Sequence, residues 1–241
     1  MLIAEQLTIV IPCKNEVGYL PNMLQLVTAQ NGIKGTRIII ADAHSTDGTR
    51  KYIQQVIIDY AEVLGIELID GGKVSAARNA GLQLVATPLV LFLDADSMLT
   101  NEKQIQQCLE KFTAKRLDLM GAPVRGKEPY TLYGLIFFLF NIANRLLRVI
   151  MPFAVGNFFL TRTEMIKQFG GFDEQAIHGE DYLLSLKYSP RKFGFSPYAI
   201  LQDSRRFKKT GHIKFVAISI LSFLMSWNRK FFYRDIGYWG K

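Results

Sequence analysis

The sequence has little cysteine and no long uninterrupted apolar run. These two scarcities argue against a disulfide-rich protein and against a membrane-spanning one. Its two cysteines, Cys13 and Cys108, lie far apart and lack the close spacing of metal-binding pairs. We therefore expect a reducing compartment and no disulfide framework. No stretch reaches the roughly 20 apolar residues of a membrane-spanning helix, and no basic segment with a cleavage site precedes the first apolar run. The sequence predicts neither a span nor a secretory signal.

Acidic residues are also scarce, but only toward the C-terminus. Residues 1–203 hold 20 Lys and Arg against 20 Asp and Glu, whereas residues 204–241 hold nine basic residues and one acid, Asp235. Clustered positive charge binds phosphate, in nucleic acid or in anionic lipid. Because aliphatic residues separate the basic ones, where a nucleic-acid site would have exposed stacking aromatics, we expect a membrane surface and no nucleic acid. A solvated basic tail remains the alternative.

Apolar segments, by contrast, are plentiful and alternate in type. The chain has 241 residues, of which 49% are hydrophobic and 21% charged, as in one well-buried α/β domain. The predicted strands cover Leu7–Ile11, Arg37–Ala41, Ile66–Ile69 and Leu89–Leu93. The predicted helices cover Tyr19–Thr28, Thr49–Leu64, Ser75–Leu84 and Glu102–Lys115. This alternation indicates βαβ units, and hence a mostly parallel central sheet flanked by helices.

Two carboxylates, Asp94 and Asp96, directly follow the fourth predicted strand. Residues 89–93 have no polar face, as expected of a strand in the middle of a sheet covered on both faces. Ligands of open α/β sheets bind outside the carboxyl ends of such strands. Paired hard oxygen ligands there suit Mg²⁺ or Mn²⁺ bound together with substrate phosphates. The alternative is a strand that ends in an acidic turn.

Polar loops follow the other strands of this predicted sheet as well. They are residues 12–16, residues 42–49, and the glycine turn 71–72, which leads into a helix with Arg78 near its start. A helix N-terminus with a cation nearby binds diphosphate well. Each loop alone is a weak signal, but together they indicate one site at one edge of the sheet.

In their order along the chain, these loops resemble family 2 glycosyltransferases of the GT-A fold. The matching segments are Pro-x-x-Asn-Glu (12–16), Asp-x-x-Ser-Thr-Asp-Gly-Thr (42–49), Ala-Arg-Asn-x-Gly (77–81), Asp-Ala-Asp (94–96), Gly-Gly-Phe-Asp-Glu (170–174) and Gly-Glu-Asp (179–181). The resemblance covers about residues 5–190. It implies a GT-A-type, Rossmann-like mixed sheet with C-terminal amphipathic helices. No Gly-x-Gly-x-x-Gly follows the first strand, so a simple dinucleotide-binding domain is not expected.

The resemblance also implies roles for individual residues. Those expected at the nucleotide donor are Pro12, Asn15, Glu16, Asp42, Arg78 and Asp94. Mg²⁺ or Mn²⁺ is expected on Asp96, with His212 as the candidate third ligand. The acceptor side is expected at Gly156, Asn157 and Glu180, with residues 156–159 as a strand lining it. Asp181 is expected to be the general base, because an acceptor hydroxyl must lose its proton to a positioned carboxylate.

The expected reaction is transfer of one sugar from a nucleotide donor, preferably a UDP-sugar, with inversion. The Gln/Arg-x-x-Arg-Trp element of processive relatives does not follow the Glu-Asp pair. The expected domains are a catalytic domain at 1–203, with its donor half at about 1–100 and its acceptor half at about 101–203, and a membrane-associating tail at 204–241. A sugar-nucleotide-forming nucleotidyltransferase and a non-catalytic, membrane-bound nucleotide or lipid binder are the alternatives.

Two predicted helices, Tyr133–Met151 and Phe215–Trp227, suggest where the acceptor lies. Both are apolar except for a few polar positions, which in the first are Asn141, Asn144, Arg145 and Arg148. Such helices suit the interfacial plane of a membrane. We therefore expect a cytoplasmic protein, peripheral at the inner face of the cell membrane, with a polyprenyl- or lipid-linked acceptor. Packing on the domain or at a homodimer contact is the alternative. A bare polyprenyl phosphate acceptor would need Asp181 less, since phosphate is already deprotonated.

Overall fold

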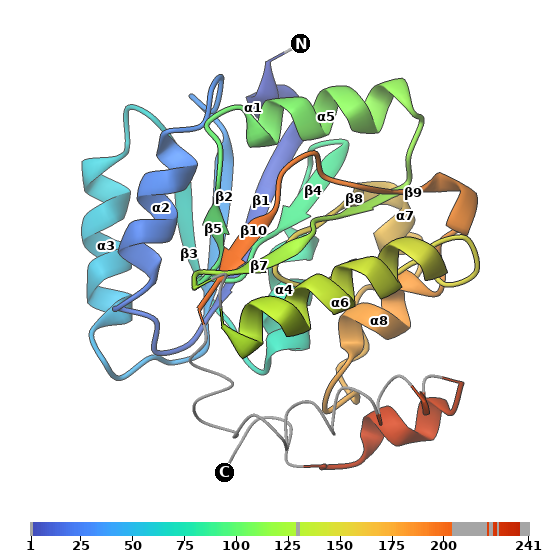
Figure 1. Ribbon diagram of the computed structural model, residues 1–241. Coiled ribbons are helices and arrows are strands. Elements are labelled where there is room, and N and C mark those ends of the chain that lie inside the picture. The colour runs from blue at the N-terminus through green and yellow to red at the C-terminus, as the bar shows by residue number, and fades with distance from the viewer. Residues whose placement is uncertain (1, 129–130, 204–220, 222–223, 226, 237–241) are drawn as a thin grey trace.

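The structure is a computed structural model that describes residues 2–128, 131–203, 221, 224–225 and 227–236 (Figure 1). Its centre is a seven-stranded sheet, counted over these residues, with the order β3-β2-β1-β4-β8-β6-β9. The strands in that order are Gly65–Asp70, Arg37–Asp42, Leu7–Cys13, Leu89–Phe92, Phe159–Arg162, Leu119–Gly121 and Phe193–Phe195. The first four run parallel, and β8 is antiparallel to both of its neighbours. The predicted mixed, mostly parallel sheet is confirmed.

Helices cover both faces of this sheet. On one face lie α2 (Leu20–Thr28), α3 (Thr49–Asp59) and α5 (Gln104–Ala114), and on the other α4 (Val74–Gln83), α7 (Thr163–Gln168) and α8 (Glu180–Ser185). A hydrophobic core lies on each face of the sheet, and alternate side chains of β1 point into one or the other. Ile9 and Ile11 pack on the first face and Val10 on the second, all fully buried. A strand buried on both faces needs an apolar run, which explains why residues 7–11 have no polar side except Thr8.

A smaller sheet and one long helix accompany the central sheet. Strands β5 (Met98–Leu99), β10 (Ile200–Gln202) and β7 (Val124–Gly126) form a three-stranded sheet in that order within the described residues. Helix α6 (Leu132–Leu147) follows β7 and runs along the front of the molecule in Figure 1. The short elements are α1 (Ile3–Gln6), η1 (Pro190–Lys192) and η2 (Arg229–Tyr233).

The C-terminal segment with η2 packs against residues 176–183, which include the start of α8. Phe231 and Phe232 are buried in a cluster with Ala176, Tyr182 and Leu183. The backbone N–H of Ile177 donates to the carbonyl oxygen of Phe232 over 2.9 Å. Part of the predicted tail is therefore a structural element of the domain, which its basic composition did not reveal.

Most predicted elements are confirmed, although the bounds of some differ, and α6 ends at Leu147 where the sequence predicted Met151. Helix α3 ends at Asp59 because residues 60–64 form a turn, in which the N–H groups of Val63 and Leu64 both bond to the carbonyl of Tyr60. Residues 156–158 form a turn before β8, so the predicted acceptor-side strand begins only at Phe159. The predicted helix 215–227 falls largely outside the described residues. None of the helices in the described ranges has both the length and the apolarity needed to cross a bilayer.

Candidate active site

Four polar loops meet at the carboxyl edge of the central sheet. In the parallel register, Cys13 at the end of β1 pairs with Asp42 at the end of β2, and Asp42 pairs with Asp70 at the end of β3. Residues 94–97 follow β4, which pairs with β1 on its other side. Strand ends at one edge bring the following loops together. The convergence predicted from the order of strands and loops is therefore present.

The first two loops are tied to each other by hydrogen bonds. The N–H of Asn15 donates to Oγ of Ser45, and the N–H of Thr46 donates back to Oδ1 of Asn15, each over 2.8 Å. The N–H of Glu16 donates to Oγ1 of Thr49 over 2.8 Å. Asn15 has a φ of 55°, in the left-handed region that asparagine tolerates better than most residues. These bonds give the predicted donor loop a single backbone shape.

Asp42 lies under these loops, completely buried and held from two directions. Its carboxylate accepts bonds from the hydroxyl and the N–H of Ser45, and from Nη1 of Arg50 over 3.2 Å. Burial, reinforced by the charge of Asp42, raises the pKa of the neighbouring Cys13 thiol far above its usual range. Since the thiolate is the reactive form, Cys13 is a packing residue and not a nucleophile.

Arg78 joins the donor half of the site to the acceptor half. Its guanidinium forms ion pairs of 2.7 Å with Asp94 after β4 and of 2.7 Å with Glu180 at the start of α8. Burial lowers its pKa, but Asp94, Glu180 and Asp181 raise it by more, so the net shift is upward and Arg78 stays charged. Its charge lies 5.1 Å from the centre of the Phe172 ring. A buried cation with several carboxylates around it is a strong tie between two parts of a fold.

Gly156 is a glycine because of Arg78. A Cβ on Gly156 would lie 2.3 Å from Nη2 of Arg78. The N–H of Gly156 donates over 2.8 Å to Oδ2 of Asp181, so the turn before β8 contacts both the cation and the predicted base. The turn itself is closed by the N–H of Phe158, which donates to the carbonyl of Val155 over 3.0 Å.

The carboxylate of Asp181, the predicted general base, is held by backbone N–H groups beside other charged side chains. Its side chain accepts from the N–H groups of Gly156 and, over 2.7 Å, Tyr182. Burial and the charge of Glu180 raise its pKa to about 7, against the opposing effect of Arg78 and the two N–H donors. General bases are most effective when their pKa lies near the working pH. Strongly shifted carboxylates in a cluster of this kind are candidates for catalysis.

The predicted metal carboxylates lie next to this cluster. The side chain of Asp94 is 27% exposed, and Asp96 is half-buried. Ser97 donates to the carbonyl of Asn157 over 2.9 Å, which joins this loop to the predicted acceptor side. Oδ1 of Asn157 is buried and accepts no hydrogen bond from the described part of the chain. Across residues 2–128, 131–203 and the described C-terminal stretches, no three His, Cys, Asp or Glu side chains gather as a metal site. His212 lies outside the described residues.

Two residues at the site, Asn79 and Phe232, were not among the predicted site residues. Asn79 bonds to the N–H and the carbonyl of Phe172 and to Glu174, and so holds the loop 170–174 against α4. Phe232 covers Gly179, where a Cβ would lie 2.7 Å from the ring. The Ala-Arg-Asn segment contained the signal for Asn79. The role of Phe232 depends on a contact between distant segments, which no local pattern announces.

A family model described as glycosyl transferase family 2 matches residues 8–170 of this chain. The chain belongs to this family. The match includes the donor loops, Arg78 and the Asp94–Asp96 pair, and it ends just before the loop that leads to Asp181. The resemblance read from the motifs is confirmed.

Two curated relatives show how much of the chain is shared. A teichoic acid poly(glycerol phosphate) polymerase of Staphylococcus epidermidis is 34% identical over 108 residues, which are 44% of this chain and 15% of the polymerase. A validoxylamine A glucosyltransferase of Streptomyces hygroscopicus subsp. jinggangensis is 31% identical over 108 residues, 43% of this chain and 24% of the relative. The matched segment therefore spans less than a quarter of the length of each of these two relatives.

Solved structures confirm the GT-A-type fold. S. aureus TarS (residues 1–349), in complex with UDP-GlcNAc, superposes with a TM-score of 0.64 at 20% identity, over 82% of this chain and 58% of that one. A mannosyltransferase from Pyrobaculum calidifontis, with GDP-Man and Mn²⁺, superposes with a TM-score of 0.64 at 16% identity, over 88% of this chain and 64% of that one.

Proposed function

We propose that this family 2 glycosyltransferase moves one sugar from a nucleotide-diphosphate donor to a lipid-linked acceptor, by a single displacement that inverts the anomeric centre. The observation that carries the proposal is the ion-pair cluster of Arg78. It links Asp94, on the donor side, to the helix whose second residue is Asp181, the base with a pKa raised to about 7. A donor loop and a proton acceptor joined by one buried cation suit direct transfer between two bound substrates.

The donor side of the proposal rests on the loops at the ends of β1, β2 and β4. Asn15, Glu16 and Asp42 would hold the base and ribose, with Pro12 beside them at the end of β1. The positive charge of Arg78 would face the diphosphate side. We favour a uridine donor, which TarS binds as UDP-GlcNAc, whereas the mannosyltransferase binds GDP-Man. Both structures support a nucleotide sugar as the donor class.

Asp94 and Asp96 fit Mg²⁺ or Mn²⁺ by the chemistry of their oxygen ligands. Two carboxylates are enough for an ion that keeps waters and substrate phosphates in its coordination sphere. Asp94 is partly exposed beside the sheet edge, and its pairing with Arg78 holds it in place. When bound, such an ion would neutralise charge on the departing nucleoside diphosphate. The Mn²⁺ in the mannosyltransferase structure supports this part of the proposal.

On the acceptor side, Asp181 would take the proton of the attacking hydroxyl. Glu180 accepts from Arg78 over 2.7 Å and would position the helix, while Gly156 and Asn157 would line the acceptor. Buried N–H donors on both oxygens of Asp181 fix its direction. The basic C-terminal segment favours a polyprenyl- or lipid-linked acceptor at the inner face of the cell membrane, with the protein bound there peripherally.

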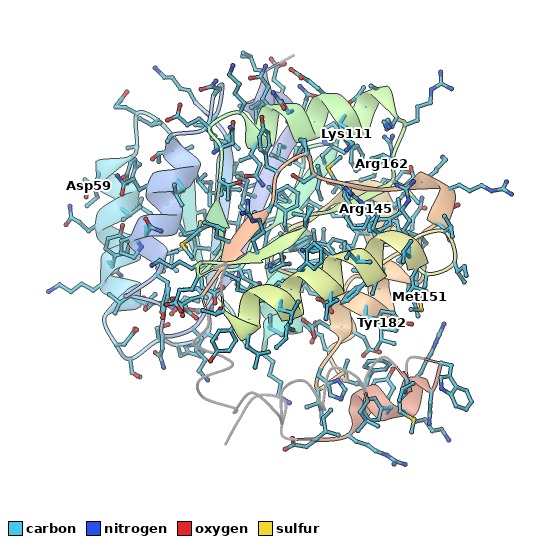
Figure 2. All side chains as sticks on the ribbon, viewed as in Figure 1. Asp59, Lys111, Arg145, Met151, Arg162 and Tyr182 are labelled. Atoms are coloured by element: carbon cyan, nitrogen blue, oxygen red, sulfur yellow. The ribbon has the colours of Figure 1, made fainter. Side chains whose placement is uncertain are left out.

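A thermal-shift panel tests the donor and the metal together. We expect one of the UDP-, GDP- or dTDP-sugars to raise the melting temperature in the presence of Mn²⁺, because a ligand at 100 times its dissociation constant adds about 2.7 kcal/mol to the stability. Asp96→Ala should abolish the Mn²⁺-dependent part of the shift. The exposed Asp59 on α3, labelled in Figure 2, provides the matched control Asp59→Ala, which should keep it.

The outcomes separate the parts of the proposal. A shift that is identical with and without Mn²⁺ would contradict the metal, and no shift with any donor would contradict the nucleotide sugar. The anomeric configuration of the product, read by NMR after transfer to a lipid acceptor, decides inversion. Retained configuration would overturn the single displacement by Asp181.

A further inference from the structure

Helix α6 turns two of its polar side chains, Asn141 and Asn144, toward the protein. The side-chain amide of Asn141 bonds to both the N–H and the carbonyl of Val124 in β7, over 3.0 and 2.7 Å. Asn144 is buried and donates to the carbonyl of Phe153 over 3.0 Å. An amphipathic helix on a globular domain normally buries its apolar stripe instead. Helix α6 buries only Tyr133 and Asn144 and packs Phe140 on Phe153, and it leaves many of its large apolar side chains on the outside.

Large apolar side chains are exposed along α6 and just after its end. Among the described residues, half of the exposed large hydrophobics lie between positions 132 and 150. They are Leu132, Leu135, Phe138, Leu139, Ile142, Leu146, Val149 and Ile150. Steps of three and four residues place most of them on one face of the helix. An exposed apolar patch of this kind marks an interaction site.

The charges around this face favour one occupant. Residues 129–163 contain three arginines and no acidic residue. Arg145 and Arg148 are exposed, and in Figure 2 Arg145 lies in the same part of the view as Lys111 of α5. Burial lowers the pKa of Lys111, and the positive charges of Arg145 and Arg148 add to this. Arg162 is ion-paired with Asp118 over 3.0 Å, so its charge is offset within the domain. Apolar side chains edged by positive charge match a bilayer surface that contains anionic lipid.

We infer that α6 lies in the plane of an anionic membrane surface, with residues 132–150 inserted between lipid headgroups. The helix has 16 residues, too few to span a bilayer, which agrees with an interfacial position. A second copy of the chain fits this face less well, because paired helices are matched by opposite charges along their edges and α6 offers no acid. The inference deepens the proposed function and relies on it for the lipid-linked acceptor.

A series of ring contacts connects this face to the site. Phe140 of α6 packs on Phe153 at 5.9 Å between ring centres, Phe153 on Tyr182 at 5.5 Å, and Tyr182 on Phe232 at 5.6 Å. Tyr182 follows Asp181 and donates its N–H to that carboxylate. Docking of α6 would therefore fix the height of the predicted base above the lipid headgroups, where the sugar acceptor of a lipid is presented.

Vesicle flotation with two matched variants of the full chain tests the inference. Leu146 on α6 is 70% exposed and Ile58 on α3 is 71% exposed, so glutamate at either position costs little folding stability. We expect the wild type to float with phosphatidylcholine vesicles containing one-third phosphatidylglycerol, and more weakly with phosphatidylcholine alone. Leu146→Glu should weaken vesicle binding about tenfold or more, and Ile58→Glu should leave it unchanged.

The remaining outcomes are equally informative. Equal binding by both variants, or no binding by the wild type, would overturn the inference. A wild-type dimer that ignores vesicles and dissociates on Leu146→Glu would give the face to a second copy. Donor-induced thermal shift, measured without lipid, should be the same in both variants. Vesicle binding without any donor response would leave the docking surface intact and contradict the proposed glycosyl transfer instead.

Discussion

Replacing Asp181 with asparagine should make the protein more stable at alkaline pH while it abolishes transfer to a hydroxyl acceptor. The pKa of Asp181 is raised from 3.8 to about 7, mainly by burial. Below pH 4 the carboxyl is protonated in both the folded and the unfolded chain. Between pH 4 and 7 the unfolded chain ionises first, so the free energy of unfolding of the wild type falls as the pH rises.

The size of this loss follows from the interval between the two pKa values. At 1.36 kcal/mol per pKa unit, it reaches at most about 4 kcal/mol above pH 7. The asparagine variant avoids this loss but gives up one of the two bonds to backbone N–H groups, at a cost of about 1 kcal/mol. We expect Asp181→Asn to exceed the wild type by about 3 kcal/mol at pH 8 and to lie within about 1 kcal/mol of it at pH 4.5.

Urea unfolding of both proteins from pH 4.5 to 8 measures this difference. Asp59→Asn, a change on the exposed face of α3, is the control and should show no growing difference with pH. A difference between Asp181→Asn and wild type that is constant with pH, or a wild type that is the more stable at pH 8, would refute the raised pKa. In the activity assay, full transfer by Asp181→Asn to a hydroxyl acceptor would refute the role as base, whereas tolerance with polyprenyl phosphate alone would identify a phosphate acceptor.

Two further substitutions test the packing around the base. Gly156→Ala brings a Cβ to within 2.3 Å of Nη2 of Arg78 and should lower transfer at least about tenfold, whereas Gly18→Ala, with nothing within 4 Å, should have no effect, as steady-state kinetics would show. Equal activity of the two would contradict the fixed position of Arg78. Phe232→Ala should cost about 3–5 kcal/mol by thermal or urea unfolding, because its ring is buried over Gly179. Tyr233→Phe, which removes only the bond to the half-buried Asp173, should cost about 1 kcal/mol or less, and a similar loss for both would contradict the docking of this segment.

For the proposed membrane binding, the structure adds the orientation of one helix. The sequence predicted the amphipathic helix within residues 133–151, and a helix over Leu132–Leu147 is confirmed. Composition alone left open whether its apolar side packs on the domain or faces outward. Asn141 and Asn144 decide the direction, because each side-chain amide forms hydrogen bonds with backbone groups of the domain. If the helix were turned over, these backbone groups would lose those partners.

The central fold and the donor loops were predictable because their causes are local. A strand buried on both faces must be apolar along its length, as β4 is, and parallel strand ends necessarily meet at one edge. The position of Asp94 and Asp96 follows from these two facts. The family motifs extended the same reasoning to Arg78 and to the Glu180–Asp181 pair.

What the tertiary structure decided depends on pairs that are distant in sequence. Arg78 meets Glu180 across 102 positions, and that contact, with burial, sets the charge environment of Asp181. Gly156 and Phe232 likewise matter only through the side chains packed against them. A pKa depends on burial and on neighbouring charges in space, and neither quantity is encoded in the spacing of residues along the chain. The sequence alone therefore names Asp181 as the candidate base, and only the fold places the burial and the neighbouring charges that raise its pKa to about 7.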